Sequence, residues 1–264
     1  MLLIAERINS SRKDIERAIR EKDAAFIQNE AKTQAQAGAD YIDVNAGSFV
    51  ERETEYLTWL IETVQSAVET PLCLDSPNPA AIEAVISMAD KTPFINSISV
   101  DIDRAGRMLS LAVKYNAKVI GLCQGAGLHG QSVDEKVMLA GRLVNMAASA
   151  GVPLDNLYID PLAYPLSADH VSALATLEAI ERIMNEFDGV HTICGLTNVS
   201  YGLPERRLVN RTFLVAALMK GLDAVIMDPT DRNLYAALKA GLMVAGRDEY
   251  CMEYITAYRQ GLIE

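Results

Sequence analysis

The chain has 264 residues, half of them hydrophobic, and its 24 lysines and arginines against 35 aspartates and glutamates give a formal net charge of −11. This acidic balance argues against broad nucleic-acid binding, which requires a basic surface. No apolar run reaches the roughly 18 residues of a membrane span, and Glu6 and Arg7 follow Met1 too soon for a secretory signal. We therefore expect a globular protein that binds neither nucleic acid nor membranes.

The cysteines are widely spaced and form no Cys-x-x-Cys pair; they are Cys73, Cys123, Cys194 and Cys251. Three of them fall inside predicted strands, which favours free, buried thiols in a reducing cytoplasm over disulfides. The cysteine and histidine spacing does not suit zinc, and we expect no metal site.

Short apolar segments alternate with amphipathic stretches along the whole chain. Predicted strands occupy residues 2–9, 41–47, 72–76, 94–99, 118–124, 157–160, 192–200 and 224–229. Predicted helices cover residues 11–21, 23–37, 51–69, 103–115, 132–150, 170–187, 204–220, 233–244 and 248–263. Ser11 with Asp14 predicts a capping box for the first helix, and Asn78 before Pro79 predicts the start of a further one.

These segments make eight strand–helix units. Apolar strands alternating with helices indicate a parallel sheet covered by helices, and eight units in about 250 residues match a closed barrel. A doubly wound open sheet is the alternative, but no Gly-x-Gly-x-x-Gly follows a strand. We therefore predict the α/β class and a (β/α)8 TIM barrel, with residues 1–264 as one domain.

Polar residues gather where the predicted strands end. Because sites in such barrels form at the carboxyl ends of the strands, one mouth should collect Glu6, Asn9, Asp43, Asn45, Asp75, Asn96, Gln124, Asp160, Asn198 and Asp228. A helix cap or turn explains Asp43 or Asp228 equally well when each is taken alone. The repetition of such residues from strand to strand favours a polar ligand even when these two are set aside, since buried polar groups need partners.

Strand alternation also predicts which residues fill the barrel. It places Cys73 on the face of Asp75, and Cys194 and Leu196 on the face of Asn198, so that these three residues would fill the barrel core.

The strand ends lack an obvious nucleophile. His129, His170 and His191 fall in a loop, at a helix start and at a strand start, where local hydrogen bonds explain them better than catalysis does. Lys118 begins its strand, so a Schiff base at a strand end has no lysine. The mouth is suited to hold a ligand through carboxylates and amides, and the donor and acceptor edge of a pterin fits that description.

Six motifs, in chain order, resemble the methyltetrahydrofolate:corrinoid protein methyltransferases. They are Glu6-Arg-Ile-Asn9, Leu74-Asp75-Ser76, Ile95-Asn96-Ser97, Tyr158-Ile-Asp160-Pro161, Gly195-Leu-Thr-Asn198-Val-Ser200 and Leu208-Val-Asn-Arg211-Thr-Phe213. Two positions depart from the family: Thr197 replaces a familiar serine, and the loop at 201–204 is less polar.

The resemblance implies a homodimeric barrel that binds the pterin of tetrahydrofolate and works with a corrinoid, cobalamin-type, carried by a partner protein. It implies that Asp75, Asn96 and Asp160 hydrogen-bond the pterin, and that Asn198 reaches N5 of the folate as the catalytic residue. The substrate-binding residues that it implies are Glu6, Asp75, Asn96, Asp160, Gly195, Asn198 and Arg206.

The expected activity is methyl transfer between N5 of tetrahydrofolate and the cobalt of that corrinoid, in either direction, with cobalt(I) as the nucleophile. One alternative is dihydropteroate synthase, which needs a basic set for pyrophosphate that the seventh-strand motif lacks. Another is a folate-binding or corrinoid-docking subunit without turnover. Arg206 or Arg207 would meet the glutamate tail of folate or, equally well, form a surface salt bridge.

Overall fold

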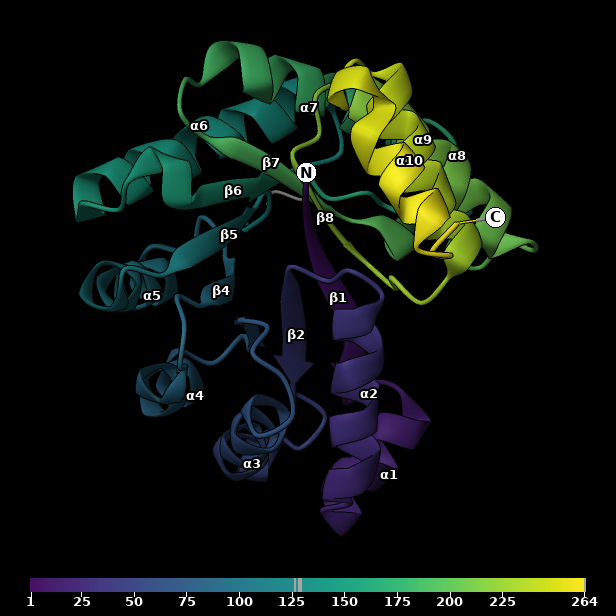
Figure 1. Ribbon diagram of the computed structural model, residues 1–264. Helices are drawn as coiled ribbons and strands as arrows, with labels where there is room; N and C mark the ends of the chain where they lie inside the picture. The colour runs from purple at the N-terminus through teal and green to yellow at the C-terminus, as the bar shows by residue number, and fades with distance from the viewer. Residues whose placement is uncertain (126, 128–129, 264) are drawn as a thin grey trace.

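The computed structural model describes residues 1–125, 127 and 130–263, and these residues form a closed ring of eight parallel strands (Figure 1). Each strand pairs with its neighbours in chain order, and β8 pairs with β1 to close the ring. The strands are β1 Leu2–Asn9, β2 Tyr41–Asn45, β3 Leu72–Asp75, β4 Phe94–Ile98, β5 Lys118–Leu122, β6 Leu157–Asp160, β7 His191–Gly195 and β8 Ala224–Met227. The predicted single-domain (β/α)8 barrel is confirmed.

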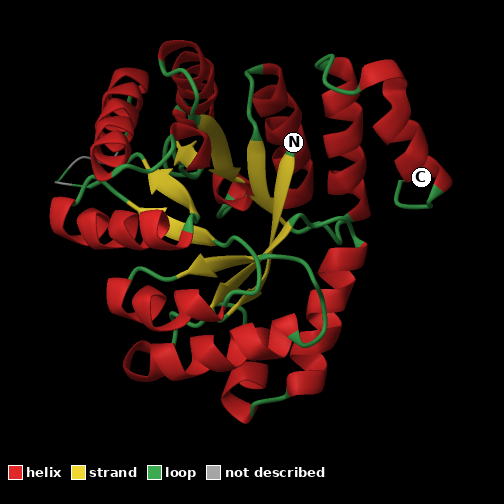
Figure 2. Ribbon diagram, turned by 60° about the vertical axis from the view of Figure 1, so that its left-hand side comes forward, coloured by secondary structure: helices red, strands yellow, loops and turns green. Residues whose placement is uncertain are grey.

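The helices surround the strands as an outer ring (Figure 2). They are α1 Lys13–Glu21, α2 Ala24–Gln36, α3 Glu53–Gln65, α4 Pro79–Val85, α5 Ile102–Tyr115, α6 Val133–Ala150, α7 Ser172–Glu186, α8 Arg206–Met219, α9 Arg232–Val244 and α10 Met252–Arg259. Short 3₁₀ segments are η1 Val50–Arg52, η2 Ile86–Met88, η3 Leu154–Asn156, η4 Leu196–Ser200 and η5 Glu249–Cys251. No helix among the described residues is long and apolar enough to cross a membrane.

Of the two helix caps predicted from the sequence, the structure contains one and lacks the other. Asn78 accepts the N–H of Ala80 at 3.0 Å and caps α4, as predicted. The capping box of Ser11 and Asp14 is wrong, because the side chain of Asn9 takes the N–H of Ser11 in a turn. Helix α1 therefore begins two residues after Ser11, without a side-chain cap.

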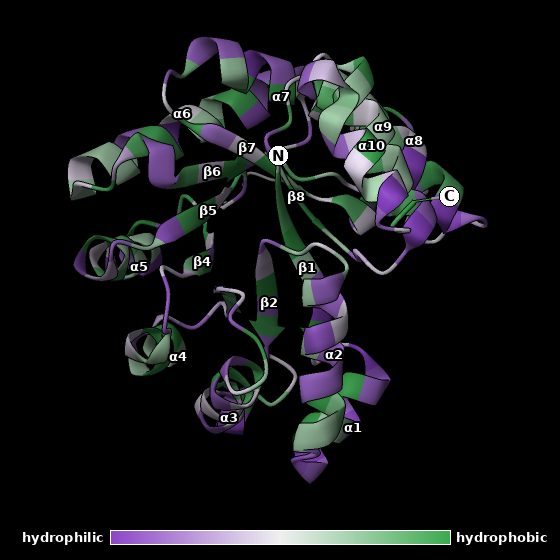
Figure 3. Cartoon of the chain, viewed as in Figure 1, coloured by the Kyte–Doolittle hydropathy of each residue, from purple (hydrophilic) through white to green (hydrophobic). Residues whose placement is uncertain are grey.

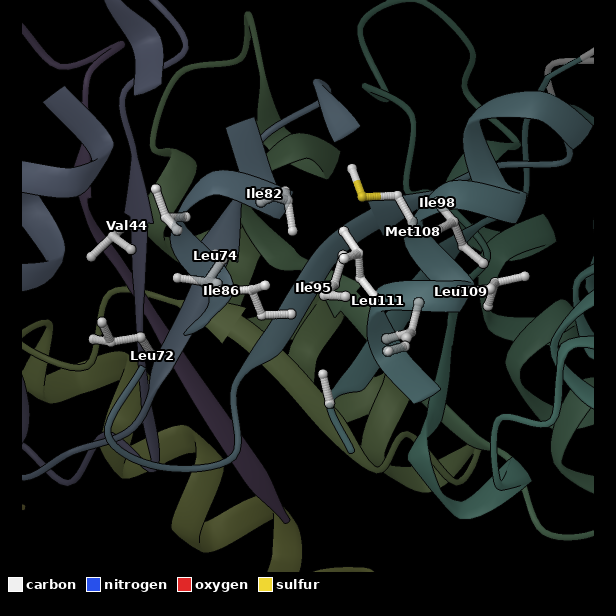
Figure 4. Close-up of a cluster of buried hydrophobic side chains, with 14 of the residues drawn as sticks. Val44, Leu72, Leu74, Ile82, Ile86, Ile95, Ile98, Met108, Leu109 and Leu111 are labelled. Atoms are coloured by element: carbon white, nitrogen blue, oxygen red, sulfur yellow. The ribbon is translucent and has the colours of Figure 1, made fainter. Parts of the chain in front are cut away.

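The main core lies between the strands and the helices. Leu72, Leu74 and Ile95 point outward from β3 and β4, and they pack with Ile82 of α4 and Met108 of α5 (Figure 4). The strands are largely hydrophobic, whereas much of the outer helical surface is hydrophilic (Figure 3). The fold is thus stabilised mainly outside the barrel, which leaves its mouth available for polar groups.

Two residues predicted to fill the barrel lie outside it. Cys194 and Leu196 are buried in the cluster that β7 and β8 form with α8 and α9, whereas Ile193 belongs to the cluster inside the barrel. The error arises because β7 ends at Gly195 and the chain continues as η4, so the two-residue alternation does not reach Asn198. Cys73 does lie inside the barrel, as predicted.

Aromatic and aliphatic side chains close the barrel at its amino-terminal end. Phe94 contacts the rings of Tyr41 and Tyr158 edge-on, with centroids 4.7 and 4.9 Å away. Tyr158 stacks on His191 at 4.6 Å and accepts a hydrogen bond from the Lys118 ammonium at 3.1 Å. We call these five residues the barrel floor.

All four cysteines are free thiols, as predicted. Cys73, Cys123 and Cys194 are buried, and Cys251 is partly exposed.

Candidate functional site

A cleft of about 890 Å³ opens at the carboxyl ends of the strands. Its walls come from the ends of β1 to β4, β7 and β8, from η4 and from the first turns of α8 and α9. The polar residues that line it include Glu6, Asn9, Asp43, Asp75, Asn96, Thr197, Asn198, Arg206, Asn210, Asp228 and Thr230. Most of the strand-end residues predicted to meet at one mouth do so.

The wall of the cleft that β2 to β4 form carries two hydrogen-bonded pairs, each of one amide and one carboxylate. The Asn96 amide donates to Asp43 at 3.2 Å, and the Asn45 amide donates to Asp75 at 2.9 Å. Burial raises the pKa of Asp43 well above its usual value, with a further contribution from Asp75, and burial raises the pKa of Asp75 to about 6. Asn45 itself does not line the cleft and acts by orienting Asp75.

Strand β1 contributes two successive residues, Glu6 and Arg7, to the lining of the same cleft. Their side chains would point to opposite faces of a regular strand. The pairing of β1 with β2, however, shifts register between Ala5 and Ile8, which is how a β-bulge redirects side chains. Burial and the nearby charge of Asp228 raise the pKa of Glu6 to about 7.

Arg7 holds the cleft wall together. Its guanidinium pairs with Glu30 of α2, and donates to Asp228 at 2.9 Å and to Thr230 at 3.3 Å. Arg7 was not predicted from the sequence, because the local pattern does not indicate the bulge that directs its side chain into the cleft.

Asp160 lies just behind the cleft and not on its lining. It is 4% exposed, and it accepts the N–H groups of Leu162 at 2.7 Å and Gly195 at 3.3 Å. Burial raises its pKa to about 6, against the lowering effect of those two hydrogen bonds. Gly195 does line the cleft, so the position without a side chain separates Asp160 from the open space.

Asn198 is exposed at the mouth on η4 and not at a strand end, which corrects the predicted strand of residues 192–200. A Cβ atom placed on Gly195 would lie 3.4 Å from Asn198 Nδ2 and 4.0 Å from Asp160 Oδ2. The amide of Asn198 and the carboxylate of Asp160 therefore flank the same glycine.

Arg206 fastens η4 in place. From the first turn of α8 its guanidinium donates to the carbonyl oxygen of Thr197 at 2.8 Å and to the hydroxyl of Ser200 at 3.1 Å. Its side chain also lies over the ring of Tyr201 at 5.8 Å. Arg206 thus lines the cleft and at the same time supports the segment that carries Asn198.

Four further arginines line the cleft besides Arg206: Arg7, Arg12, Arg207 and Arg232. Sequence reasoning named only Arg207 among these, as a candidate for the glutamate tail of folate. In the structure Arg207 Nε lies 3.5 Å from Asp231, and its side chain is 83% exposed. The site therefore has an inner layer of carboxylates and amides and an arginine-rich rim.

The remaining candidates lie away from the cleft. Gln124 is not among its lining residues. His191 is held at the floor by Asp223 at 2.8 Å and Asp155 at 3.1 Å, which confirms that it is satisfied locally. His170 is exposed just before α7, and His129 lies outside the described residues. In the described part of the chain, no three His, Cys, Asp or Glu side chains are arranged to hold a metal ion.

Such a cleft can accept several N–H groups from a flat heterocycle and offer amides to its ring nitrogens, and no nucleophile of its own is required. Residues 5–228 match the family of pterin binding enzymes, to which the chain therefore belongs. Within that family the chain is 38% identical to the methylcorrinoid:tetrahydrofolate methyltransferase of Eubacterium limosum, over its whole length and 98% of that protein. The family predicted from the six motifs is thus confirmed.

More distant proteins share the same barrel. The chain is 25% identical over 240 residues to methionine synthase of Mycobacterium tuberculosis, which covers 86% of the chain and 20% of that protein. A dihydropteroate synthase from Coxiella burnetii, solved with pteroic acid, superposes with a TM-score of 0.69 at 16% identity, covering 92% of this chain and 93% of that one. At this identity the likeness concerns the fold alone.

Proposed function

We propose that the protein moves a methyl group from a methylcorrinoid to N5 of tetrahydrofolate, with the pterin seated in the mouth cleft. Methyl transfer between folate and a corrinoid agrees with the relative of 38% identity. The direction follows the name of that relative. The observation that carries the proposal is the convergence of carboxylates and amides from β1 to β4 and η4 on one cleft.

Asp75, Asn96 and Asp160 form the pterin clamp in this proposal. Because the Asn96 amide nitrogen already donates to Asp43, its carbonyl oxygen remains for a ligand N–H. Asp75 and Asp160 each keep free lone pairs after the hydrogen bonds that orient them. The absence of a side chain at Gly195 gives a ring edge access to Asp160.

Asn198 is proposed as the residue that contacts N5. In the proposed direction, the N5 lone pair forms the new bond to the methyl carbon, the cobalt–carbon bond breaks with its electron pair left on cobalt, and N5 loses a proton. An amide can accept a hydrogen bond from N5–H and donate to N5 in the reverse reaction. In the described part of the chain no residue hydrogen-bonds this amide, so it is available to the ligand.

Glu6 is placed among the substrate-binding residues. Its pKa of about 7 allows the carboxyl to exchange a proton at neutral pH, which suits a cleft in which N5 gains and loses one. Arg206 contributes by fixing η4, and Arg207 on the rim is the candidate for the glutamate tail.

The corrinoid is proposed to arrive on a separate protein that docks over the mouth, and the whole of residues 1–264 to act as one barrel unit in a homodimer. We propose a cytoplasmic location, which suits four free thiols. The dihydropteroate synthase alternative is disfavoured by the relative of 38% identity, whereas its support is likeness of fold.

The proposal is tested by mixing the protein with tetrahydrofolate and a methylated corrinoid protein and recording the cobalt absorption spectrum. The expected result is loss of the methylcobalt bands with equimolar formation of 5-methyltetrahydrofolate. For the variant Asn198→Ala, the matched control is Asn29→Ala. Asn29 is an exposed asparagine on α2, and this control should behave like the wild type. No spectral change in either direction would contradict the transferase.

A further inference from the structure

Lys136 is fully buried, which is rare for a lysine. It stands in the first turn of α6, and its ammonium group reaches the loop after β6. There it donates to the carbonyl oxygens of Pro161 at 2.5 Å and Leu162 at 2.7 Å, with the ring of Tyr164 at 5.2 Å. A buried charge is costly unless its protons are hydrogen-bonded, and these two carbonyl groups supply such bonds.

The loop that Lys136 holds also orients Asp160. Leu162 has a φ of +60°, a left-handed conformation that side chains rarely adopt. Its N–H donates to Asp160 Oδ1 at 2.7 Å, while its carbonyl oxygen accepts from Lys136 and from the Thr176 hydroxyl at 3.2 Å. The same residue is therefore gripped by the lysine at its carbonyl group and by the aspartate at its amide.

We propose that Lys136 is a positioning residue for Asp160: it fixes the turn at Pro161 and Leu162 that orients the carboxylate, and it supplies positive charge behind it. This inference deepens the proposed function, in which Asp160 binds the pterin.

Among the residues that the structure describes, the other titratable groups around Asp160 are not cationic. They are the thiols of Cys123 and Cys194 and the phenol of Tyr164, and burial raises the pKa of each of them, which keeps all three neutral. Burial lowers the pKa of Lys136, and the charge of Glu135 on the same helix opposes that lowering. Burial raises the pKa of Asp160 to about 6, and Lys136 opposes that rise. Loss of the ammonium should therefore raise the pKa of Asp160 further.

The test is a carbon-13 NMR titration of the aspartate carboxyl groups in the ligand-free protein, with the Asp160 signal assigned by its loss in Asp160→Asn. In Lys136→Met the titration midpoint of Asp160 should rise, and in Lys136→Arg it should return towards the wild-type value. Lys239→Met is the matched control, because Lys239 is a half-buried lysine bound to Glu253 on the far helices. An unchanged midpoint in Lys136→Met would overturn the proposal.

If circular dichroism shows that Lys136→Met is unfolded, the test uses Lys136→Arg alone. It keeps the charge but alters the geometry at the two carbonyl groups, so the dissociation constant for tetrahydrofolate should rise about tenfold. A wild-type dissociation constant would overturn the positioning role. The NMR titration needs no ligand, so a failure of methyl transfer in the wild-type protein would count against the proposed function and leave this inference standing.

Discussion

Asn96 of β4 donates its amide hydrogen to Asp43 of β2 at 3.2 Å, across the intervening strand β3. The contact fixes which end of the Asn96 amide faces the cleft. Asp43 is 2% exposed and was, from the sequence alone, equally well explained as a turn former. In the structure it orients Asn96, which is one of the residues proposed to bind the pterin.

Replacing Asp43 with alanine should weaken tetrahydrofolate binding about tenfold, or about 1.4 kcal/mol, because the Asn96 amide loses its orienting partner. The melting temperature should rise, since a buried carboxyl with a raised pKa is removed. Isothermal titration and thermal unfolding measure the two effects. Asp43→Asn keeps an acceptor oxygen and should recover most of the affinity; equal affinities for wild type and Asp43→Ala would contradict this role.

Asn198→Ala should lower the rate of methyl transfer by about 10²–10³, the usual effect of removing one preorganised hydrogen bond in a transition state. Because the residue is exposed on η4, the melting temperature should stay unchanged. Single-turnover spectroscopy of the cobalt measures the rate. Turnover and folate affinity both near the wild-type values would show that Asn198 has no part in the reaction.

Gly195→Ala tests the close approach of Asn198 to strand β7. The added methyl group would lie 3.4 Å from Asn198 Nδ2, and the φ of −72° at Gly195 is one that alanine readily adopts. We expect a loss of turnover and folate affinity of about tenfold, because the methyl group stands between the ligand and Asp160. The matched control is Gly106→Ala on α5, where a Cβ atom would have no neighbour within 4 Å. This substitution should stabilise the protein by about 0.5–1 kcal/mol. Equal activity of the two variants would contradict the packing argument.

The ligand-free protein should become less stable as the pH rises from 5.5 to 8. A carboxyl group whose pKa is higher in the folded chain binds its proton more tightly there, so its stabilising effect is complete below the unfolded pKa and is lost as pH rises through the folded value. These values are about 7 for Glu6 and about 6 for Asp75 and Asp160. Asp223 raises the pKa of His191, which acts in the same direction.

Thermal unfolding at several pH values measures this effect, and a decrease of several degrees in Tm is expected between pH 5.5 and 8. Glu6→Gln should flatten the upper part of the curve, whereas Glu83→Gln, an exposed glutamate of α4, should leave it unchanged. A Tm that rises over this range would show that the cleft carboxylates are not strained by burial.

The barrel could be predicted from the sequence because apolar strands and helices alternate with a regular period, and each strand end announces itself by a polar residue. Asn96 and Asp75 were found in this way. Arg7 was not, because it enters the cleft through a bulge, and a bulge is set by pairing with β2 and not by the local sequence. Lys136 was also missed, since a lysine in a helix is normally a surface residue.

The end of the seventh strand could not be predicted from the sequence either. Residues 192–200 are consistent with a single strand in their composition, but the chain turns into η4 after Gly195, and Arg206, six residues beyond Ser200, holds it there. A contact that forms only in the folded chain thus decides which way Asn198 faces.

The barrel floor and the mouth lie at opposite ends of the same strands. The rings packed around Phe94 and the hydrogen bonds of His191 to Asp223 and Asp155 add stability at one end. At the other end, the burial of carboxyl groups lowers the stability. Evolution can therefore alter the two ends separately, but not without limit. A chain whose floor has been weakened, for instance by Phe94→Ala, should tolerate fewer substitutions at the mouth, so that the history of changes at the floor governs which new ligands the mouth can acquire.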